Sequence, residues 1–409
     1  IPLAIELAAA RIKMLSVDEI AARLDDRFSL LTSGSRTAIP RHHTLRATID
    51  WSYDLLTEPE RILLRRLAVF AGGFTLEAAE AVCSDGMKRS GILDLLGRLV
   101  DKSLVIVDEI SKVSETRYRL LETIRQYAIE KLTGTEEALA IRDRHLEFYL
   151  ELAEKAEPYI FSSKSVEWVT RLGKELDNIR AAMDWSTNSG KAVAALQIAG
   201  SLVYFWWAHA LLASEWRVRV QQALSRPEGR ERTLGRAKAL NGIGFIFWLE
   251  TDHTDNRPAL VEALSIGREL GDRWNIATAL RNLGLLDNIQ GNYQEARSFL
   301  EQSLAIWREM GADGKLEYAM ALSYLGDVAL NCNEKQEASS LYDESVAVLM
   351  GPGLGDINFL GYPIRRLGQV ARGEGRYEEA KARCKESLWL NHEVGDPRGV
   401  MCCVAGFAA

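Results

Sequence analysis

Apolar positions follow a helical spacing through most of the chain, and in the last third the pattern itself repeats. Residues 279–290 place alanine and leucine on one face of a first helix, and a Gly-Asn-Tyr sequence at 291–293 breaks it. A second apolar face then runs from about 294 to 310. The marks of this unit return every 42 residues, as Leu283-Gly284, Leu325-Gly326 and Leu367-Gly368, as Ala296, Ala338 and Ala380, and as Ser303, Ser345 and Ser387. Such a period without strand patterns predicts a solenoid of stacked helical hairpins.

The repeat resembles the tetratricopeptide family, with helices longer than the usual unit of about 34 residues. The resemblance covers residues 236–409, where a degenerate copy from Ala239 to Asp272 precedes the regular units. The glycine after each repeat leucine, such as Gly284, leaves room for the paired helix to approach closely. Arrays of this kind bind other molecules and seldom catalyse reactions, so we expect a binding function for this part of the chain.

The first helices of such units usually face the concave side of the array, and they supply the candidate partner-binding residues. These candidates are Arg281, Asn282, Tyr324, Arg365 and Arg366. Arginine and tyrosine are enriched among the side chains that dominate protein recognition. We therefore predict that a protein, a peptide or a small inducer binds the inner surface of the solenoid.

The first third of the chain has a different pattern, in which short helices precede two β-prone segments. Helices are predicted at 44–56, 58–70, 76–82 and 91–99, and β-prone stretches at 104–107 and 116–120 flank a polar turn. A further helix is predicted from Glu122 to about Leu132. Helices followed by a hairpin describe a winged-helix domain at 41–135, and residues 136–235 are expected to form a helical linker or the start of the solenoid. The expected fold class is thus mainly α.

Four stretches of this region resemble the signal-transduction ATPases with numerous domains, in particular bacterial regulatory ATPases attached to LuxR-type or antibiotic-regulator-type DNA-binding domains. The stretches are 1–5, 45–56, 63–74 and 118–128, in the order of that family. The resemblance implies that residues 1–40 belong to the helical lid of an NTPase domain missing from this chain, and that the parent protein uses ATP or ADP with Mg. It also implies an adenine contact at Pro2 and Leu3, whereas Leu120-Leu121-Glu122 replaces the phosphate-sensing histidine of many relatives.

Motifs for catalysis and for metal binding are missing from the sequence. The phosphate-binding pattern GxxxxGK[ST] does not occur, the adjacent His42 and His43 have no ligand set around them, and the five cysteines lack CxxC spacing. The chain also starts in mid-motif without a methionine. We therefore expect the C-terminal part of a larger protein, with no enzymatic activity and no cofactor of its own.

Charge and hydropathy add two limits. The net charge of −7 offers no basic surface for a phosphate backbone. Residues 192–214 contain no charged side chain and are numerous enough to cross a bilayer. Gln197 and Gly200 interrupt this stretch and no cluster of basic residues flanks it, so one or two buried helices and a cytoplasmic protein are expected.

Three functions stay open from the sequence. The favoured one is the regulatory and sensor portion of a nucleotide-driven switch, in which ligand binding to the solenoid shifts an equilibrium between two states. The second is a free-standing scaffold that binds a peptide or protein through residues 136–409. The third is a DNA-binding regulator with the 90–99 helix in a major groove. Because Asp94 and Asp101 alternate with Arg89 and Arg98 there, direct DNA binding is not expected.

Overall fold

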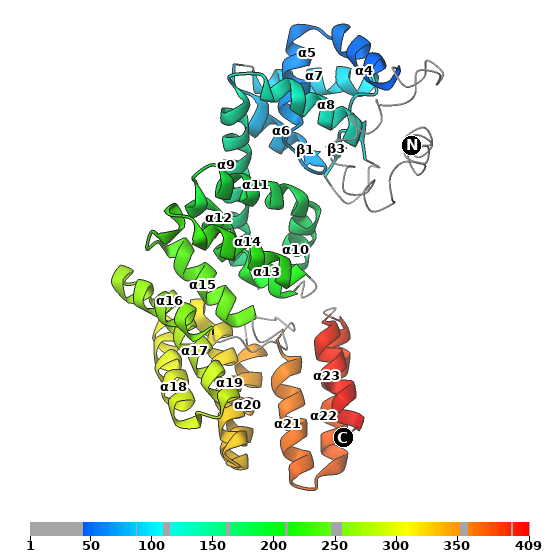
Figure 1. Ribbon diagram of the computed structural model, residues 1–409. Helices are drawn as coiled ribbons and strands as arrows, with labels where there is room; N and C mark the ends of the chain where they lie inside the picture. Colours follow the sequence, from blue (N-terminus) through cyan, green and yellow to red (C-terminus); the bar gives the residue numbers. More distant parts are fainter. Residues whose placement is uncertain are drawn as a thin grey trace, which may run out of the picture. The chain divides into compact units, whose positions relative to one another are not determined.

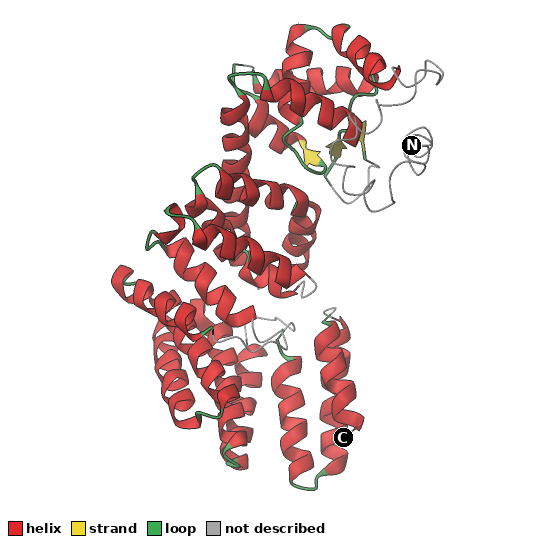
Figure 2. Ribbon diagram, viewed as in Figure 1, coloured by secondary structure: helices red, strands yellow, loops and turns green. Residues whose placement is uncertain are grey.

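The computed structural model describes residues 44–86, 88–108, 115–160, 164–208, 212–246, 256–351, 359–393 and 396–408. These residues are almost entirely helical, and their few strands all lie in the first third of the chain (Figure 1, Figure 2). The chain divides into two compact units, residues 1–141 and 142–409. A winged helix followed by a helical solenoid is confirmed as the fold class. The predicted lid at 1–40 lies outside the described residues.

The first unit contains five helices and a small sheet among its described residues. The helices are α4 (Thr44–Asp54), α5 (Glu58–Leu67), α6 (Leu76–Cys83), α7 (Arg89–Asp101) and α8 (Glu122–Thr133). The strands β1 (Phe74–Thr75), β2 (Ile106–Val107) and β3 (Arg117–Arg119) pair antiparallel in the order β1-β3-β2. The predicted hairpin is β2 and β3, with Ile106 opposite Arg119. Strand β1 was not predicted, because two residues carry no readable alternation.

Local sequence signals set the helix boundaries of this unit. Thr57 and Glu60 form a capping box at the start of α5, with the Thr57 amide donating to Glu60 Oε2 at 2.8 Å. Thr75 Oγ1 accepts from the Ala78 amide at 3.1 Å and begins α6. Phe70 and Phe74 are fully buried and stack with ring centroids 4.8 Å apart. They pack the sheet against the helices.

The second unit opens with helices that precede the regular repeats. They are α9 (Ala138–Ala156), which begins just before the unit boundary, α10 (Ser165–Lys174), α11 (Leu176–Asn188), α12 (Ala192–Ser201), α13 (Val203–Ala208), α14 (Ala213–Ser225), α15 (Leu234–Ile246) and α16 (Arg257–Leu270). The described residues of the uncharged stretch at 192–214 form the short helices α12 and α13 and the first residues of α14. Within the described ranges, every helix is too short or too polar to span a bilayer.

The regular repeats are three helical hairpins and one further helix. They comprise α17 (Arg273–Gln290) with α18 (Tyr293–Met310), α19 (Lys315–Asn331) with α20 (Lys335–Leu349), α21 (Gly361–Gly373) with α22 (Tyr377–Glu393), and α23 (Pro397–Ala408). The two helices of each hairpin lie side by side in Figure 1. Gly291, Asn333 and Gly375 have positive φ at the three hairpin turns. Asparagine tolerates this left-handed conformation better than most residues, which explains why the middle turn can do without a glycine.

The serine mark of the repeat is a hydrogen bond inside each hairpin. Ser303 Oγ donates to the Ala277 carbonyl at 2.8 Å, Ser345 Oγ to the Ala319 carbonyl at 2.8 Å, and Ser387 Oγ to the Gly361 carbonyl at 2.7 Å. All three serines are fully buried. Each therefore fixes its second helix against the beginning of the first helix of the same unit.

The glycine mark is a site of close helix contact, as the sequence predicts. A Cβ added to Gly284 would lie 2.7 Å from Leu300 Cγ and 3.0 Å from the Ala296 carbonyl oxygen. Gly284→Ala is therefore expected to lower the free energy of unfolding by about 2 kcal/mol, through overpacking. Gly97→Ala is the matched control, because a Cβ there meets nothing within 4 Å and alanine favours a helix by up to about 1 kcal/mol. Urea unfolding measures both, and equal effects would contradict the packing account.

Candidate partner-binding site

A buried ion pair joins the first helices of two successive repeats. Arg281 of α17 pairs with Glu317 of α19, and the two side chains are 1% and 3% exposed. The Tyr204 hydroxyl of α13 also donates to Glu317 Oε1, although 113 residues separate the two in sequence. The Arg281 guanidinium lies over the ring of Phe245, 5.6 Å from its centroid. Polar side chains of the first helices thus meet residues from before the repeats.

A small pocket of about 40 Å³ lies beside this ion pair. Its walls come from the turn after α9 and from helices α12, α13, α15 and α17. The lining residues are Glu157, Gly200, Ser201, Val203, Tyr204, Lys238, Asn241, Gly242, Phe245, Trp274, Asn275, Thr278, Arg281 and Asn282. Apolar rings and amide or hydroxyl groups share this surface, as is common in sites that bind small groups of a ligand.

Asparagine side chains order the polar wall of the pocket. Asn241 Nδ2 donates to Asn275 Oδ1 at 3.1 Å, and Asn282 Nδ2 donates to the Asn241 carbonyl at 3.1 Å. Two buried atoms of lining residues, Asn241 Oδ1 and Thr278 Oγ1, have no hydrogen-bond partner among the described residues. Leaving such atoms unpaired costs folding free energy, so they are candidates for ligand contacts.

A second buried polar cluster lies farther along the array, around Asp327 of α19. Its carboxylate accepts from the Tyr342 hydroxyl at 2.7 Å and from the Tyr362 hydroxyl, and Arg366 Nε lies 2.9 Å from Oδ1. Burial raises the pKa of Tyr342 and Tyr362, so their hydroxyls stay protonated donors at neutral pH. The cluster ties α19, α20 and α21 together.

The sequence-predicted partner-binding residues fall into three environments. Arg281 and Asn282 line the pocket, Tyr324 is 1% exposed in the core, and Arg365 and Arg366 are half-buried with their guanidiniums 5.3 and 5.4 Å from the Tyr362 ring centroid. Tyr324 is therefore not on an open surface, because the rings of Phe359 and Tyr362 pack edge-on against its ring. Contact of these five residues with a partner stays a prediction. Pro2 and Leu3 lie outside the described residues.

Sequence reasoning missed Tyr204, Asn241 and Thr278 as wall residues. Tyr204 belongs to the uncharged aromatic stretch, where the pattern predicts only burial. Asn241 and Thr278 each follow an apolar residue, Leu240 and Ala277, on buried parts of their helices, and a polar residue at such a position is the signal that could have found them.

The exposed face of α7 in the winged helix has no excess of positive charge. Arg89 and Arg98 are exposed there, and so are Asp94 and Asp101. Lys102, which caps the helix, donates to buried Glu60 at 2.7 Å. Burial alone would raise the pKa of Glu60, but hydrogen bonds from Lys102 and Thr57 outweigh it and lower that pKa. The Lys102 ammonium is therefore already paired with a carboxylate of the same domain.

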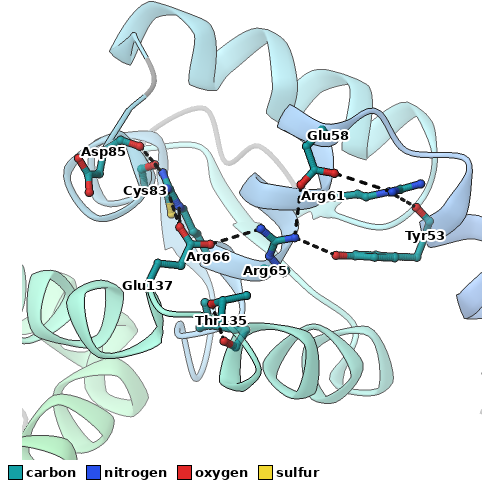
Figure 3. A network of polar contacts seen from close by, with 10 residues as sticks. Tyr53, Glu58, Arg61, Arg65, Arg66, Cys83, Asp85, Thr135 and Glu137 are labelled. Carbon is teal, nitrogen blue, oxygen red and sulfur yellow. Dashed lines mark hydrogen bonds and ion pairs between the residues drawn. The ribbon is translucent and has the colours of Figure 1, made fainter.

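An arginine cluster joins α5 of the winged helix to the chain that follows α8 (Figure 3). Arg66 is buried, and its Nε and Nη2 donate to Glu137 Oε2 at 2.9 and 2.6 Å. Its Nη1 donates to the carbonyls of Cys83 and Asp85 at 2.7 and 2.5 Å. Arg65 Nη1 donates to the Tyr53 hydroxyl at 3.3 Å beside it. The domain thus holds the residue immediately before α9 in place.

The planar fork of Arg66 makes contacts that a lysine cannot reproduce. We expect Arg66→Lys to lower the free energy of unfolding of the first unit by about 2 kcal/mol, because two carbonyls and one carboxylate lose donors. Hydrogen exchange of peptides from residues 58–83 measures this opening. Arg119→Lys is the matched control, because Arg119 and Asp108 form an ion pair with side chains that are 46% and 42% exposed. This substitution should change the free energy of unfolding by less than about 1 kcal/mol. Equal exchange in the two variants would contradict the role of the cluster.

Two family descriptions match parts of the chain. Residues 56–133 match the winged helix-turn-helix domain, and residues 235–309 and 275–350 match the tetratricopeptide repeat. The chain combines these two modules. Both matches agree with the elements described above.

Curated relatives come from mycobacteria. A protein of Mycobacterium tuberculosis strain H37Rv, provisionally named as an HTH-type transcriptional regulator, is 42% identical over 287 residues, which cover 68% of this chain and 32% of the relative. An uncharacterized protein of the same strain is 49% identical over 148 residues, covering 36% of this chain and 37% of that protein. The chain therefore spans about a third of the length of these curated relatives.

A solved structure is similar in fold. It is a Signal Transduction ATPase with Numerous Domains protein with a tetratricopeptide repeat sensor, from Pyrococcus horikoshii. The similarity has a TM-score of 0.51 with 13% sequence identity, over 98% of this chain and 61% of the other. At this identity it supports the fold.

Proposed function

We propose that this chain is the sensor and regulatory portion of a cytoplasmic signal-transduction ATPase that controls transcription. A protein, peptide or small inducer binds the repeats, and this binding biases a nucleotide switch that lies outside the chain. The observation that carries the proposal is the combination of a pocket with apolar and polar walls at the start of the repeats with a winged helix whose α7 surface is charge-neutral. The first supplies a place for a signal, and the second suits an internal contact better than a phosphate backbone.

The wider parent protein is inferred from its relatives. Three similarities support it: the resemblance to regulatory ATPases of the LuxR or antibiotic-regulator type, the regulator-like name of the Mycobacterium tuberculosis relative, and the fold shared with the sensor-bearing ATPase of Pyrococcus horikoshii. ATP or ADP with Mg would bind in the parent, outside the residues that the structure describes. Pro2 and Leu3, assigned to the adenine contact, are also outside them.

The test compares the 409-residue chain with a longer protein from the same reading frame, if coding sequence precedes Ile1. We expect the chain alone to show no ATP turnover and the longer protein to bind ATP with Mg. Addition of a partner captured on the repeats should change the nucleotide exchange rate of the longer protein. Turnover of ATP by the chain alone would refute the proposal, and so would a longer protein that binds no nucleotide.

Direct DNA binding is the second candidate, because residues 56–133 match a winged helix-turn-helix domain. Fluorescence anisotropy with a labelled duplex tests it on the full chain. The acidic residues on α7 lead us to expect no binding that weakens steeply with salt. Tight, salt-dependent binding that is lost in Arg98→Ala would instead establish this second function.

A further inference from the structure

We propose that the pocket beside the Arg281–Glu317 ion pair binds an uncharged carboxamide, such as a glutamine or asparagine side chain of a partner peptide. The proposal rests on the proposed sensor function of the repeats and names the chemical group that one site on them accepts. Its evidence is the set of unpaired atoms in the pocket, the balance of charge around it and its size.

Two atoms of the pocket's lining residues have no partner among the described residues, and one donor and one acceptor of a ligand could pair them. Asn241 is 4% exposed and its Nδ2 is already bound to Asn275, so the free Oδ1 can only accept a hydrogen bond. Thr278 is 8% exposed and its hydroxyl can donate. A carboxamide supplies an N–H for Asn241 and a carbonyl oxygen for Thr278, and both atoms would then be paired.

The charged side chains that line the pocket, among the described residues, are already paired. Arg281 pairs with Glu317, and Lys238 Nζ lies 2.5 Å from Glu157 Oε1. A carboxylate ligand would add an uncompensated negative charge and offer no donor to Asn241. An ammonium ligand could donate to both Asn241 and Thr278, but it would add an uncompensated positive charge. Because buried charge without a partner is costly, the site should select a neutral group.

The size of the pocket agrees with this choice. At about 40 Å³ the pocket is small, and it suits a compact polar group rather than a whole ligand. Trp274 is half-buried at the wall and packs edge-on against Trp307 at 4.8 Å, and it provides an apolar surface for the methylenes that carry the amide.

Saturation-transfer NMR on the full chain tests the proposal with two probes that differ in one group, N-acetyl-L-glutamine methylamide and N-acetyl-L-glutamate methylamide. We expect millimolar binding of the glutamine probe and at least fivefold weaker transfer to the glutamate probe. Thr278→Val should weaken glutamine-probe binding about tenfold, equivalent to about 1.4 kcal/mol. Thr187→Val is the matched control, because Thr187 is buried outside the pocket and its hydroxyl already donates to the Met183 carbonyl at 2.9 Å.

Each outcome supports or overturns the carboxamide assignment or the sensor function. Equal transfer to both probes, no transfer to either, or unchanged binding in Thr278→Val would overturn the carboxamide assignment. Circular dichroism confirms that the variants are folded before they are compared. If a protein partner still binds the chain after such a result, the proposed sensor function survives without this site. If the glutamine probe binds as expected and no partner changes nucleotide exchange, the site stands and the sensor function fails.

Discussion

Glu317→Gln is expected to lower the free energy of unfolding of the second unit by about 3 kcal/mol, since it leaves the buried Arg281 guanidinium without its counter-charge. Glutamine keeps the size of the side chain, and its carbonyl oxygen can still accept from the Tyr204 hydroxyl. The loss therefore reports on charge rather than on shape. Urea unfolding followed by tryptophan fluorescence measures it, because most tryptophans of the chain lie in this unit.

Two further variants separate the ion pair from general damage. The double variant Arg281→Met with Glu317→Leu should recover much of the stability, because apolar side chains of similar volume often replace a buried ion pair without net cost. Glu269→Gln breaks an exposed ion pair, in which the side chains of Arg232 and Glu269 are 39% and 55% exposed. This variant should lower the free energy of unfolding by less than about 1 kcal/mol. If Glu317→Gln and Glu269→Gln have the same effect, the ion pair has no special role in stability.

Acidification is expected to destabilise the second unit through His145. This side chain is 3% exposed in α9, and burial lowers its pKa from 6.5 to about 4, although a hydrogen bond with Asn178 acts in the opposite direction. As the pH falls, the unfolded chain binds the proton before the folded chain does. The contribution of His145 to the free energy of unfolding is therefore fully present above pH 6.5 and is lost as the pH falls toward 4. At about 1.4 kcal/mol for each unit of the shift, the whole loss is about 3 kcal/mol.

The comparison with His145→Phe isolates this effect. An aromatic ring at this position keeps the contact with Tyr149, whose centroid lies 4.7 Å from that of His145. Between pH 7 and pH 5 the free energy of unfolding of the wild-type chain should fall by about 2 kcal/mol more than that of the variant. Glu175, which accepts from Tyr149 and Asn178, stays in both proteins and so cancels. Parallel pH curves would show that His145 is not the group responsible.

Much of the fold could be predicted because its signals are local. The 42-residue period, the capping box at Thr57 and the apolar spacing of α5 to α8 all arise from neighbours in sequence. Strand β1 escaped because it exists only through pairing with β3, 42 or more residues away. The left-handed turn at Asn333 could not be read from the sequence, because an asparagine adopts this backbone conformation only in some positions and the structure is needed to see it.

The candidate site was less predictable. Helical periodicity indicates which face of α17 carries Arg281, but it cannot indicate what covers that face. Here the cover is Tyr204, which reaches Glu317 from another helix. Tyr324 was chosen for its residue type and is buried for a similar reason, since Phe359 and Tyr362 come from outside its own hairpin. Long-range packing of this kind leaves no mark in the spacing of residues.

The serine hydrogen bonds of the repeats bear on how the array can change over evolution. Each bond begins and ends inside one hairpin, with donor and acceptor 26 residues apart in every copy. A gene duplication or deletion of one full period would therefore include both the donor and the acceptor, and neither would lose its partner. We expect the solenoids of homologues to differ in length by whole multiples of this unit. Their binding surface would then lengthen or shorten without a change inside any hairpin.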